Sequence, residues 1–388
     1  MRIGLDARWI FEEMSGIGVY TRELIRALAQ RDHNNEYMLF FDNESVRDRT
    51  VAETGIAAAP NFSTALCPYS LFSISNQLRM PALLRRAGLD VYHAPNYLIP
   101  LPAFPRRRRR ATVRCVVTIH DVIPMIFPHH APRSRKSRVY PLYRRLMIEI
   151  ARRADQIISD SETSRRDVIS YLRIMGPAQA KVHAVYCGVA PHFRPVASAP
   201  LRNGDPRHEP ATVLYVGRAD PYKNLVALVQ AFAQARKRCP FPMQLALVGA
   251  RDARYPEAER RAQELGIAAD LKWIGRLSDQ ELAETYRQAR VLVMPSRYEG
   301  FGLPVLEAMA SGTPVICGDI GTLREIAGDA ATFVDPDDVD GLAQQLVRIL
   351  TEPASAAGLV SNGLTRAARF TWDETARQTL AVYEQAAL

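Results

Sequence analysis

Glu299 and Glu307 are two carboxylates that could hold the hydroxyl groups of a sugar, and they flank a short turn. The apolar run Val291–Met294 before them is typical of a buried strand. Pro304 suits the first position of a helix, and Gly312 suits the position just past its end. The stretch therefore predicts a strand, a loop and a short helix, with one glutamate in the loop and one in the helix.

The predicted helix start is a candidate anion site, because its first N–H groups are unpaired and the helix dipole is positive there. Gly300 and Gly302 carry no Cβ, so a phosphate can approach the backbone closely. A carboxylate only accepts hydrogen bonds, and the two glutamates therefore suit ribose and hexose hydroxyls beside that phosphate. An ordinary turn with water-facing glutamates has the same composition, and on this ground alone both interpretations stay open.

The stretch Glu299-Gly-Phe-Gly-Leu-Pro-Val-Leu-Glu307, with the Ala-Met-Ala-Ser-Gly-Thr-Pro-Val that follows it, resembles the signature of the retaining glycosyltransferases of family 4 type. These enzymes have the two-domain GT-B fold and include bacterial mannosyl- and glucosyltransferases of surface polysaccharides. The resemblance implies that Glu307 holds the ribose of a sugar nucleotide and that Glu299, as a catalytic residue, holds the transferred sugar. It assigns contacts with the donor to four further residues: Gly300, Phe301, Gly302 and Leu303.

Two cations, Arg218 and Lys223, follow a strand predicted at residues 212–216. The guanidinium fork matches phosphate oxygens, and the ammonium is a point charge. A diphosphate leaving group needs such charges, because negative charge grows on it as the glycosidic bond breaks. Solvated surface cations are the ordinary alternative, but the family has an arginine and a lysine at these positions, which predicts that both bind the donor.

Asp335-Pro336-Asp337 spells the Asp-x-Asp pattern with which metal-dependent glycosyltransferases hold a cation. It lies between a predicted strand and a predicted helix, so helix capping explains it better. The resemblance implies that the diphosphate is bound without metal. We therefore expect no metal and no cofactor, since the sugar nucleotide is a substrate.

His120 follows the predicted strand Val113–Ile119, at the end of the strand where open α/β sheets bind ligands. A histidine there can donate or accept a proton, although a local cap is the alternative. The His-Asp-x-x-Pro stretch recurs in the family, where the histidine contacts the donor sugar, so His120 is the second predicted catalytic residue. Gly16 and Gly18 lie in a predicted loop after the first strand; a tight turn is one interpretation, and the resemblance makes them donor-binding.

The order of predicted elements indicates two doubly wound α/β domains facing each other across a cleft. We expect an N-terminal domain at 1–190, a proline-rich linker at 191–210, and a nucleotide-sugar-binding domain at 211–371. A final helix at 372–388 is expected to pack back on the first domain. Strands are predicted at Arg2–Leu5, Tyr37–Phe41, Asp90–His93, Val113–Ile119, Gln156–Ser159, Val182–Tyr186, 212–216, Leu245–Val248, Leu271–Ile274, Val291–Met294, Pro314–Cys317 and Thr332–Val334. Helices are predicted at 223–238, 255–266, 278–289 and 336–351. Residues 155–167 also resemble the family and are typical of a strand and a capped helix start. Their polar cluster could face the cleft, but capping alone explains it, and no catalytic role is assigned.

The composition is that of a globular protein, with 47% hydrophobic and 23% charged residues in a chain of 388. Five cysteines without a C-x-x-C pair make a disulfide framework or a zinc site unexpected, which fits a reducing cytoplasm. The N-terminus goes directly into a strand pattern, and no signal peptide is expected.

Positive charge is concentrated between Leu101 and Arg153, where fourteen Lys or Arg face two acids. Val139, Leu142, Tyr143, Leu146, Met147 and Ile150 recur at helical spacing, so this segment predicts an amphipathic helix with a cationic side. It is either a core-packed helix with a solvated face or a contact with an anionic membrane that brings in a lipid-linked acceptor. The residues assigned to this membrane or acceptor side are Arg106, Arg107, Arg108, Arg109, Arg110, Arg144 and Arg145.

The sequence thus predicts a retaining glycosyltransferase that moves a hexose to a glycan or lipid-linked acceptor at the cytoplasmic face of the membrane. The preferred donor is GDP-mannose, from which the enzyme would transfer mannose. An epimerase or a phosphorylase of the same fold is the alternative among enzymes. A nucleic-acid-binding protein, suggested by the arginine run, lacks aromatic interleaving and leaves the glutamates unexplained. We therefore expect no nucleic-acid partner.

Overall fold

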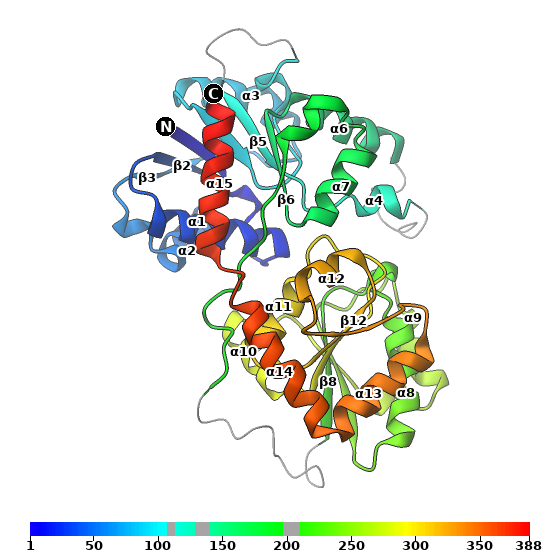
Figure 1. Cartoon of the computed structure of the whole chain (residues 1–388). Helices are drawn as coiled ribbons and strands as arrows, with labels where there is room; N and C mark the ends of the chain where they lie inside the picture. The colour runs from blue at the N-terminus through cyan, green and yellow to red at the C-terminus, as the bar shows by residue number, and fades with distance from the viewer. Residues whose placement is uncertain (107–112, 129–139, 197–209) are drawn as a thin grey trace. The chain divides into compact units, whose positions relative to one another are not determined.

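The computed structural model describes residues 1–106, 113–128, 140–196 and 210–388, which form two compact units. Unit 1 comprises Met1–Met125, Val139–Gly188 and Thr371–Leu388, and unit 2 comprises Ile126–Arg138 and Val189–Phe370. In each unit helices cover both faces of a parallel sheet (Figure 1). Most of the predicted linker lies outside the described residues, namely 197–209.

The described part of unit 1 contains seven parallel strands in the order β3-β2-β1-β4-β5-β6-β7. The strands are β1 (Arg2–Asp6), β2 (Glu36–Phe41), β3 (Phe62–Leu66), β4 (Val91–Ala94), β5 (Arg114–Thr118), β6 (Gln156–Ser159) and β7 (Val182–Ala184). The chain order reverses beside β1, which pairs with β2 on one side and β4 on the other. Ligands of open α/β sheets bind at the carboxyl ends of strands near such a reversal.

The strand β3 was not predicted from the sequence. Its residues Phe62–Leu66 are exposed or half-buried in every position, because β3 is the edge strand of its sheet. It therefore lacks the apolar run by which the buried strands were recognised.

The final helix, α15 (Trp372–Ala387), belongs to unit 1, where it lies beside α1 (Gly16–Arg31) (Figure 1). Arg31 pairs with Asp373 at 2.6 Å, and the Thr375 hydroxyl donates to the carbonyl oxygen of Tyr186. The remaining helices of the unit are α2 (Glu44–Thr54), α3 (Ile74–Arg86), α4 (Ile123–Ile126), α6 (Tyr140–Arg153) and α7 (Glu162–Tyr171).

The described part of unit 2 contains six parallel strands in the order β10-β9-β8-β11-β12-β13. They are β8 (Ala211–Val216), β9 (Met243–Val248), β10 (Leu271–Ile274), β11 (Val291–Met294), β12 (Val315–Gly318) and β13 (Thr332–Val334). The helices are α8 (Leu225–Arg238), α9 (Glu257–Glu264), α10 (Asp279–Gln288), α11 (Leu303–Ala310), α12 (Gly321–Ala327), α13 (Val339–Thr351) and α14 (Pro353–Ala367). The predicted strands of this half are confirmed to within two residues.

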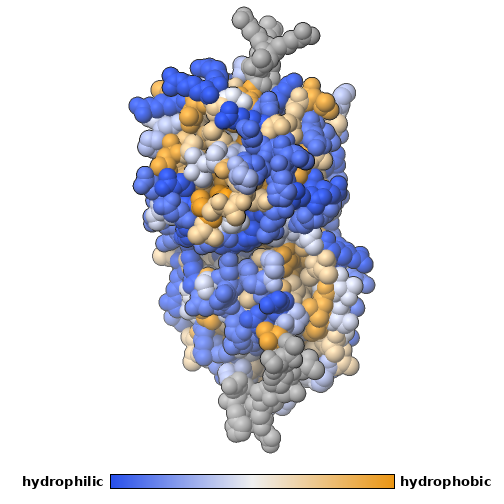
Figure 2. All heavy atoms as spheres, turned by 90° about the vertical axis from the view of Figure 1, so that its left-hand side faces the viewer, coloured by the Kyte–Doolittle hydropathy of each residue, from blue (hydrophilic) through white to orange (hydrophobic). Residues whose placement is uncertain are grey.

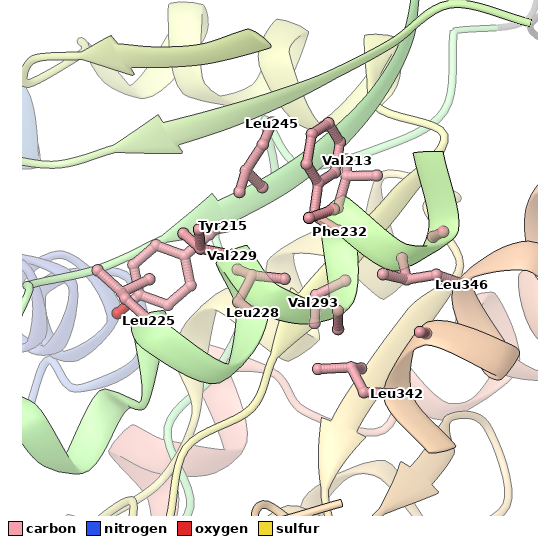
Figure 3. Close-up of a cluster of buried hydrophobic side chains, with 14 of the residues drawn as sticks. Val213, Tyr215, Leu225, Leu228, Val229, Phe232, Leu245, Val293, Leu342 and Leu346 are labelled. Atoms are coloured by element: carbon pink, nitrogen blue, oxygen red, sulfur yellow. The ribbon is translucent and has the colours of Figure 1, made fainter. Parts of the chain in front are cut away.

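The core on one face of this sheet explains why α8 forms where it does. Leu225, Leu228, Val229 and Phe232 recur at helical spacing, and all four are buried. Figure 3 shows them packed between strand residues such as Val213 and Leu245 and the α13 residues Leu342 and Leu346. This packing fixes the start of α8, which follows directly on the loop that carries Arg218 and Lys223.

The helices α12 and α14 were not predicted. α14 contains Gly358 and Gly363, which weaken the helical pattern. At Gly363 an added Cβ would lie 3.2 Å from Met309 Cγ, so glycine lets α14 approach α11 closely. Tertiary packing, rather than local propensity, explains this helix.

Candidate functional site

The loop between β11 and α11 has the predicted form of strand, glycine loop and short helix. Gly302 is the N-cap of α11 with φ +108°, and an added Cβ there would lie 2.8 Å from Leu323 Cδ2. Pro304 lies in the first turn, and Gly312 follows the helix end with φ +74°. Glycine is therefore required at 302 both for the backbone conformation and for space. The anion site expected at the first N–H groups of α11 stays a prediction. Pro304 has no N–H, and the Val305 N–H already donates to the carbonyl oxygen of Gly302.

Three side chains around this loop are held by packing or by a hydrogen bond. Phe301 is buried and makes an edge contact with Phe370, so its side chain is not available to a ligand. Leu303 is half-buried in the first turn of α11. The Thr322 hydroxyl donates to the carbonyl oxygen of Glu299, which anchors the loop.

Lys223 and Glu299 form a bidentate ion pair, in which Lys223 Nζ lies 2.7 Å from each carboxylate oxygen of Glu299. The Lys223 side chain is 14% exposed and that of Glu299 is 8% exposed. The two loops are also joined through the backbone, because the Arg297 N–H donates to the carbonyl oxygen of Tyr222. The structure therefore brings together two predicted donor residues that are 76 positions apart.

Arg218 lies on the same loop in a different environment. Its side chain is 70% exposed, and its Nε lies 2.8 Å from Asp220 Oδ2. Asn224 closes the loop in the left-handed conformation with φ +61°, and its amide donates to the carbonyl oxygens of Pro295 and Pro336. The exposed guanidinium can therefore turn toward a ligand at the cost of a surface ion pair, which is small.

Glu307 lies one turn into α11, and its Oε2 accepts a 2.8 Å hydrogen bond from the hydroxyl of Tyr286. Burial raises the pKa of Glu307 to about 7, although the Tyr286 hydrogen bond acts in the opposite direction. Tyr286 has no exposed surface and was not predicted as a site residue. Its position in the predicted helix 278–289 carries no signal of this contact, because the partners are 21 residues apart and on different helices.

The Asp335–Asp337 pattern is occupied by local contacts. Asp335 accepts from the N–H of Asp337, and Asp337 pairs with Arg297 at 2.6 Å. The cap of α13 is Asp338, which accepts from the Gly341 N–H. No cluster of three potential metal ligands occurs within the described residues.

A cavity of about 420 Å³ is lined in part by residues of the 219–227 segment. Its lining includes Asp220, Tyr255, Arg297 and Asp337. Neither Lys223 nor the two glutamates line it, so it is distinct from the site described above.

In unit 1 the structure corrects the prediction of a loop at Gly16 and Gly18. Both glycines lie in the first turn of α1, whose N-cap is Ser15, and the Ser15 hydroxyl already accepts from the Gly18 N–H. An added Cβ at Gly18 would lie 2.9 Å from Met14 Sδ and 3.3 Å from the Trp9 carbonyl oxygen. Gly16 has open space beside it. Gly18 thus serves close packing, and the donor contacts of Gly16 and Gly18 both stay predictions.

His120 lies just beyond the carboxyl end of β5, as predicted, and both ring nitrogens have partners. Nδ1 lies 2.7 Å from Asp160 Oδ2, and Nε2 lies 2.9 Å from the Pro95 carbonyl oxygen. Both partners are acceptors, so both nitrogens donate only when the ring is an imidazolium. Burial lowers the pKa of His120, but the Asp160 carboxylate outweighs it and the net pKa is raised. These contacts therefore favour the protonated ring, and neither ring nitrogen is left without a partner.

Asp160 corrects the interpretation of residues 155–167 as capping alone. Ser161 is indeed the N-cap of α7. Its neighbour Asp160 instead faces His120 at the end of the adjacent strand. Asp121, which follows His120 in the chain, forms the local cap by accepting from the Ile123 N–H.

The predicted amphipathic helix forms as α6, and only some of its apolar residues are buried. Tyr143, Met147 and Ile150 are buried, whereas the Leu142 side chain is 67% exposed. Arg145 is exposed and Arg144 half-buried. The expected single stripe is thus wrong at Leu142, and Val139 lies outside the described residues.

Part of the basic segment is neutralised within unit 1. Arg106 and Arg153 both donate to Glu149, and the hydrogen bond from Arg106 is the main reason that the pKa of Glu149 is lowered to about 2. Arg107–Arg110 lie outside the described residues.

Hydrophilic residues cover most of the face in Figure 2. Across the described ranges, no helix combines the length and apolar character needed to cross a bilayer.

Comparison with known proteins identifies the class. The model of "Glycosyltransferase Family 4" matches residues 14–193, and that of "Glycosyl transferases group 1" matches residues 201–366. The chain therefore belongs to the family 4 type of glycosyltransferases, and its two parallel-sheet units are those of the GT-B fold.

Among individual relatives, the chain is 28% identical to the O-antigen chain mannosyltransferase B of Escherichia coli over 386 residues, covering 96% of each chain. It is 34% identical to the MMP alpha-(1->4)-mannosyltransferase of Mycolicibacterium hassiacum over 284 residues, which are 68% of this chain and 66% of that one. The sucrose-phosphate synthase of Thermosynechococcus elongatus superposes with a TM-score of 0.74 at 26% identity, covering 99% and 98% of the chains.

Proposed function

We propose that the protein is a retaining mannosyltransferase that takes mannose from GDP-mannose and adds it to a glycan or lipid-linked acceptor in surface polysaccharide biosynthesis. The observation that carries the proposal is the convergence of Lys223, Glu299 and Glu307 around the start of α11. The names of the two mannosyltransferase relatives support the choice of sugar.

The donor is assigned to unit 2. The first N–H groups of α11, with Lys223 and Arg218, bind the diphosphate. Glu307 accepts from the ribose hydroxyls, and Glu299 accepts from hydroxyls of the sugar. These cations and dipoles neutralise the charge that develops on the leaving group, so the proposal invokes no metal.

The acceptor is assigned to unit 1, together with the protonated ring of His120. The acceptor hydroxyl oxygen attacks the anomeric carbon on the face from which the nucleoside diphosphate leaves. The bond between that carbon and the phosphate oxygen breaks, and the departing phosphate takes the hydroxyl proton. Attack and departure on one face retain the anomeric configuration.

An anionic membrane surface is proposed as a further partner. Exposed apolar side chains Phe72, Ile74 and Leu78 surround the start of α3, and the exposed Arg79 follows them. Apolar residues next to cations are the composition of interfacial contacts. They support reversible attachment to the cytoplasmic leaflet.

The test is a donor panel with the purified protein, which includes GDP-mannose, UDP-glucose and GDP-glucose. Nucleoside diphosphate release should be fastest with GDP-mannose, and the new linkage should have the donor's anomeric configuration by NMR. Excess EDTA should leave the rate unchanged, because no metal is invoked. Preference for a uridine donor would refute the choice of GDP-mannose, and inversion of configuration would refute the mechanism.

The two enzymatic alternatives give different products. An epimerase would release free sugar or nucleotide without an acceptor. A phosphorylase would carry a lysine-bound pyridoxal phosphate, which can be detected by its absorbance. Binding of nucleic acid with steep salt dependence would instead support the non-enzyme alternative.

A further inference from the structure

Tyr286 is a buried tyrosine whose hydroxyl bonds to a residue of the donor site. It lies on α10, has no exposed surface, and its hydroxyl is 2.8 Å from Oε2 of Glu307 on α11. A tyrosine hydroxyl beside a carboxylate donates to it, because the carboxylate can only accept. The contact therefore fixes one oxygen of Glu307.

The ring of Tyr286 is held firmly by its surroundings. It belongs to the hydrophobic core on one face of the unit 2 sheet and makes an edge contact with Phe193, with the two ring centroids 5.7 Å apart. Its carbonyl oxygen accepts from the Thr313 hydroxyl at 2.6 Å. The hydroxyl is thus placed by a packed core and needs no reorganisation when a ligand arrives.

Within the described residues, the Tyr286 hydroxyl is the group that favours the charged form of Glu307. Burial and the Asp279 charge at the start of α10 both disfavour the carboxylate. The cations on the helices that pack on α11 have other partners. Arg287 on α10 pairs with Glu284, and Arg324 on α12 pairs with Asp319. Arg366 on α14 donates to the carbonyl oxygens of Glu325 and Ile326.

We propose that Tyr286 is a positioning residue for donor binding, which holds Oε2 of Glu307 and keeps the group a carboxylate so that its other oxygen can accept from the donor ribose. The role rests on the proposed function, since it assumes that Glu307 contacts a ribose. Oε1 has no other hydrogen bond within the described residues, so it is the oxygen left for a ligand.

The experiment measures binding of GDP-mannose and of UDP-glucose by calorimetry between pH 5.5 and 8.5. Both carry the same ribose and diphosphate, and neither titrates in that range. Wild-type affinity should be constant above a pH of about 7 and should fall tenfold per pH unit below it, following Glu307. The Glu307→Gln variant should bind weakly and without this pH dependence.

The decisive variant is Tyr286→Phe, which keeps the ring and removes only the hydroxyl. Its binding curve should move to higher pH by roughly one to two units, the size expected for a lost hydrogen bond to a charged group. At pH 7 this is about a 5- to 50-fold loss of affinity, which raising the pH should progressively recover. Damage to packing would weaken binding equally at every pH.

Tyr383→Phe is the matched control, because it deletes another fully buried tyrosine hydroxyl, which bonds to His93 in unit 1. Its binding curve should coincide with the wild type. A Tyr286→Phe curve that coincides with the wild type, or that weakens without shifting, overturns the positioning role while leaving the proposed function standing. Failure of the wild-type protein to bind either sugar nucleotide would overturn the proposed function and this role with it.

Discussion

Lys223 Nζ lies 2.7 Å from both carboxylate oxygens of Glu299, and both side chains are largely buried. The two residues proposed to hold the diphosphate and the transferred sugar are therefore partners of each other before any donor is bound. Two buried opposite charges in contact stabilise each other, whereas one without its partner is costly. A donor must share these groups, with its phosphate next to the ammonium and its hydroxyls next to the carboxylate.

The first prediction concerns the stability of this pair. Glu299→Gln and Lys223→Met should each lower the free energy of unfolding by about 1–3 kcal/mol, because each leaves a partly buried charge unpaired. The double variant should cost less than the sum by about 1–2 kcal/mol. Urea unfolding of the four proteins measures this coupling. The exposed pair Arg348–Glu352, mutated in the same way, should show coupling below about 0.5 kcal/mol. Equal coupling in both pairs would contradict the burial argument.

The second prediction separates catalysis from stability at the two cations. Arg218→Ala and Lys223→Ala should each lower kcat by about 100-fold, the usual effect of losing one preorganised donor to developing charge. Arg218 is exposed, so its variant should keep the wild-type unfolding midpoint, whereas that of Lys223→Ala should fall. Arg348→Ala serves as the control with an exposed arginine that should change neither quantity. Full activity in Arg218→Ala would remove that residue from the site.

The third prediction concerns the charge on His120. Burial lowers its pKa, the Asp160 carboxylate raises it, and the net result is a raised pKa. The stabilisation from this pair is therefore complete below pH 6.5, the ordinary histidine value, and is lost as the pH rises through the raised pKa. Asp160→Asn should lower the pKa of His120, as read from ring-nitrogen NMR, and should reduce kcat at neutral pH.

The same stability difference can be followed by unfolding. Wild-type protein should lose stability relative to His120→Gln as the pH rises above 6.5 and through the raised pKa of His120, because only the wild type loses the ion pair. The exposed His33→Gln variant is the control and should follow the wild type. If Asp160→Asn leaves the His120 titration unchanged, the ring is not held as an imidazolium by that carboxylate.

The parts of the fold that could be predicted from sequence are those with a local signal. The β11–α11 segment has an apolar strand, a glycine at a positive φ and a helix-starting proline, all within 22 residues. The edge strand β3 has no such signal, since its sequence Phe-Ser-Thr-Ala-Leu mixes polar and apolar residues that are all exposed or half-buried. The glycine-bearing helix α14 depends on its contact with Met309, a residue more than 40 positions away.

The same distinction applies to the candidate site. Glu299 and Lys223 were recognised by type and by resemblance, but their pairing joins loops 76 residues apart. Tyr286 and Asp160 were missed because a buried tyrosine and a residue before a helix cap have ordinary structural explanations. The role of each residue depends on its contact partner, which is Glu307 for the Tyr286 hydroxyl and His120 for the Asp160 carboxylate. These contacts join distant parts of the chain, so the spacing of residues in the sequence does not predict them.

The last prediction concerns the basic segment. Arg106 is tied to Glu149, so replacing it would disturb α6, and the sharper variant changes Arg107–Arg110 to serine and keeps Arg106. Each cation near an anionic leaflet contributes about 1 kcal/mol, so removing four should weaken binding to anionic liposomes by roughly 100-fold or more at low salt. Phe72→Ser with Leu78→Ser tests the apolar side chains at α3 separately. Both residues are exposed, although Phe72→Ser also removes an edge contact with Trp9.

Slow hydrolysis of the donor in solution should persist in both variants, because neither variant changes a residue assigned to the donor or to catalysis. The control replaces Lys237 and Arg238, which are exposed at the end of α8 in unit 2, to distinguish a specific cationic segment from net charge. Transfer to a water-soluble acceptor should be unaffected in every variant, while transfer to a lipid-linked acceptor in vesicles should fall with liposome binding. Wild-type protein that ignores anionic liposomes at low salt would show that these arginines are only solvated surface.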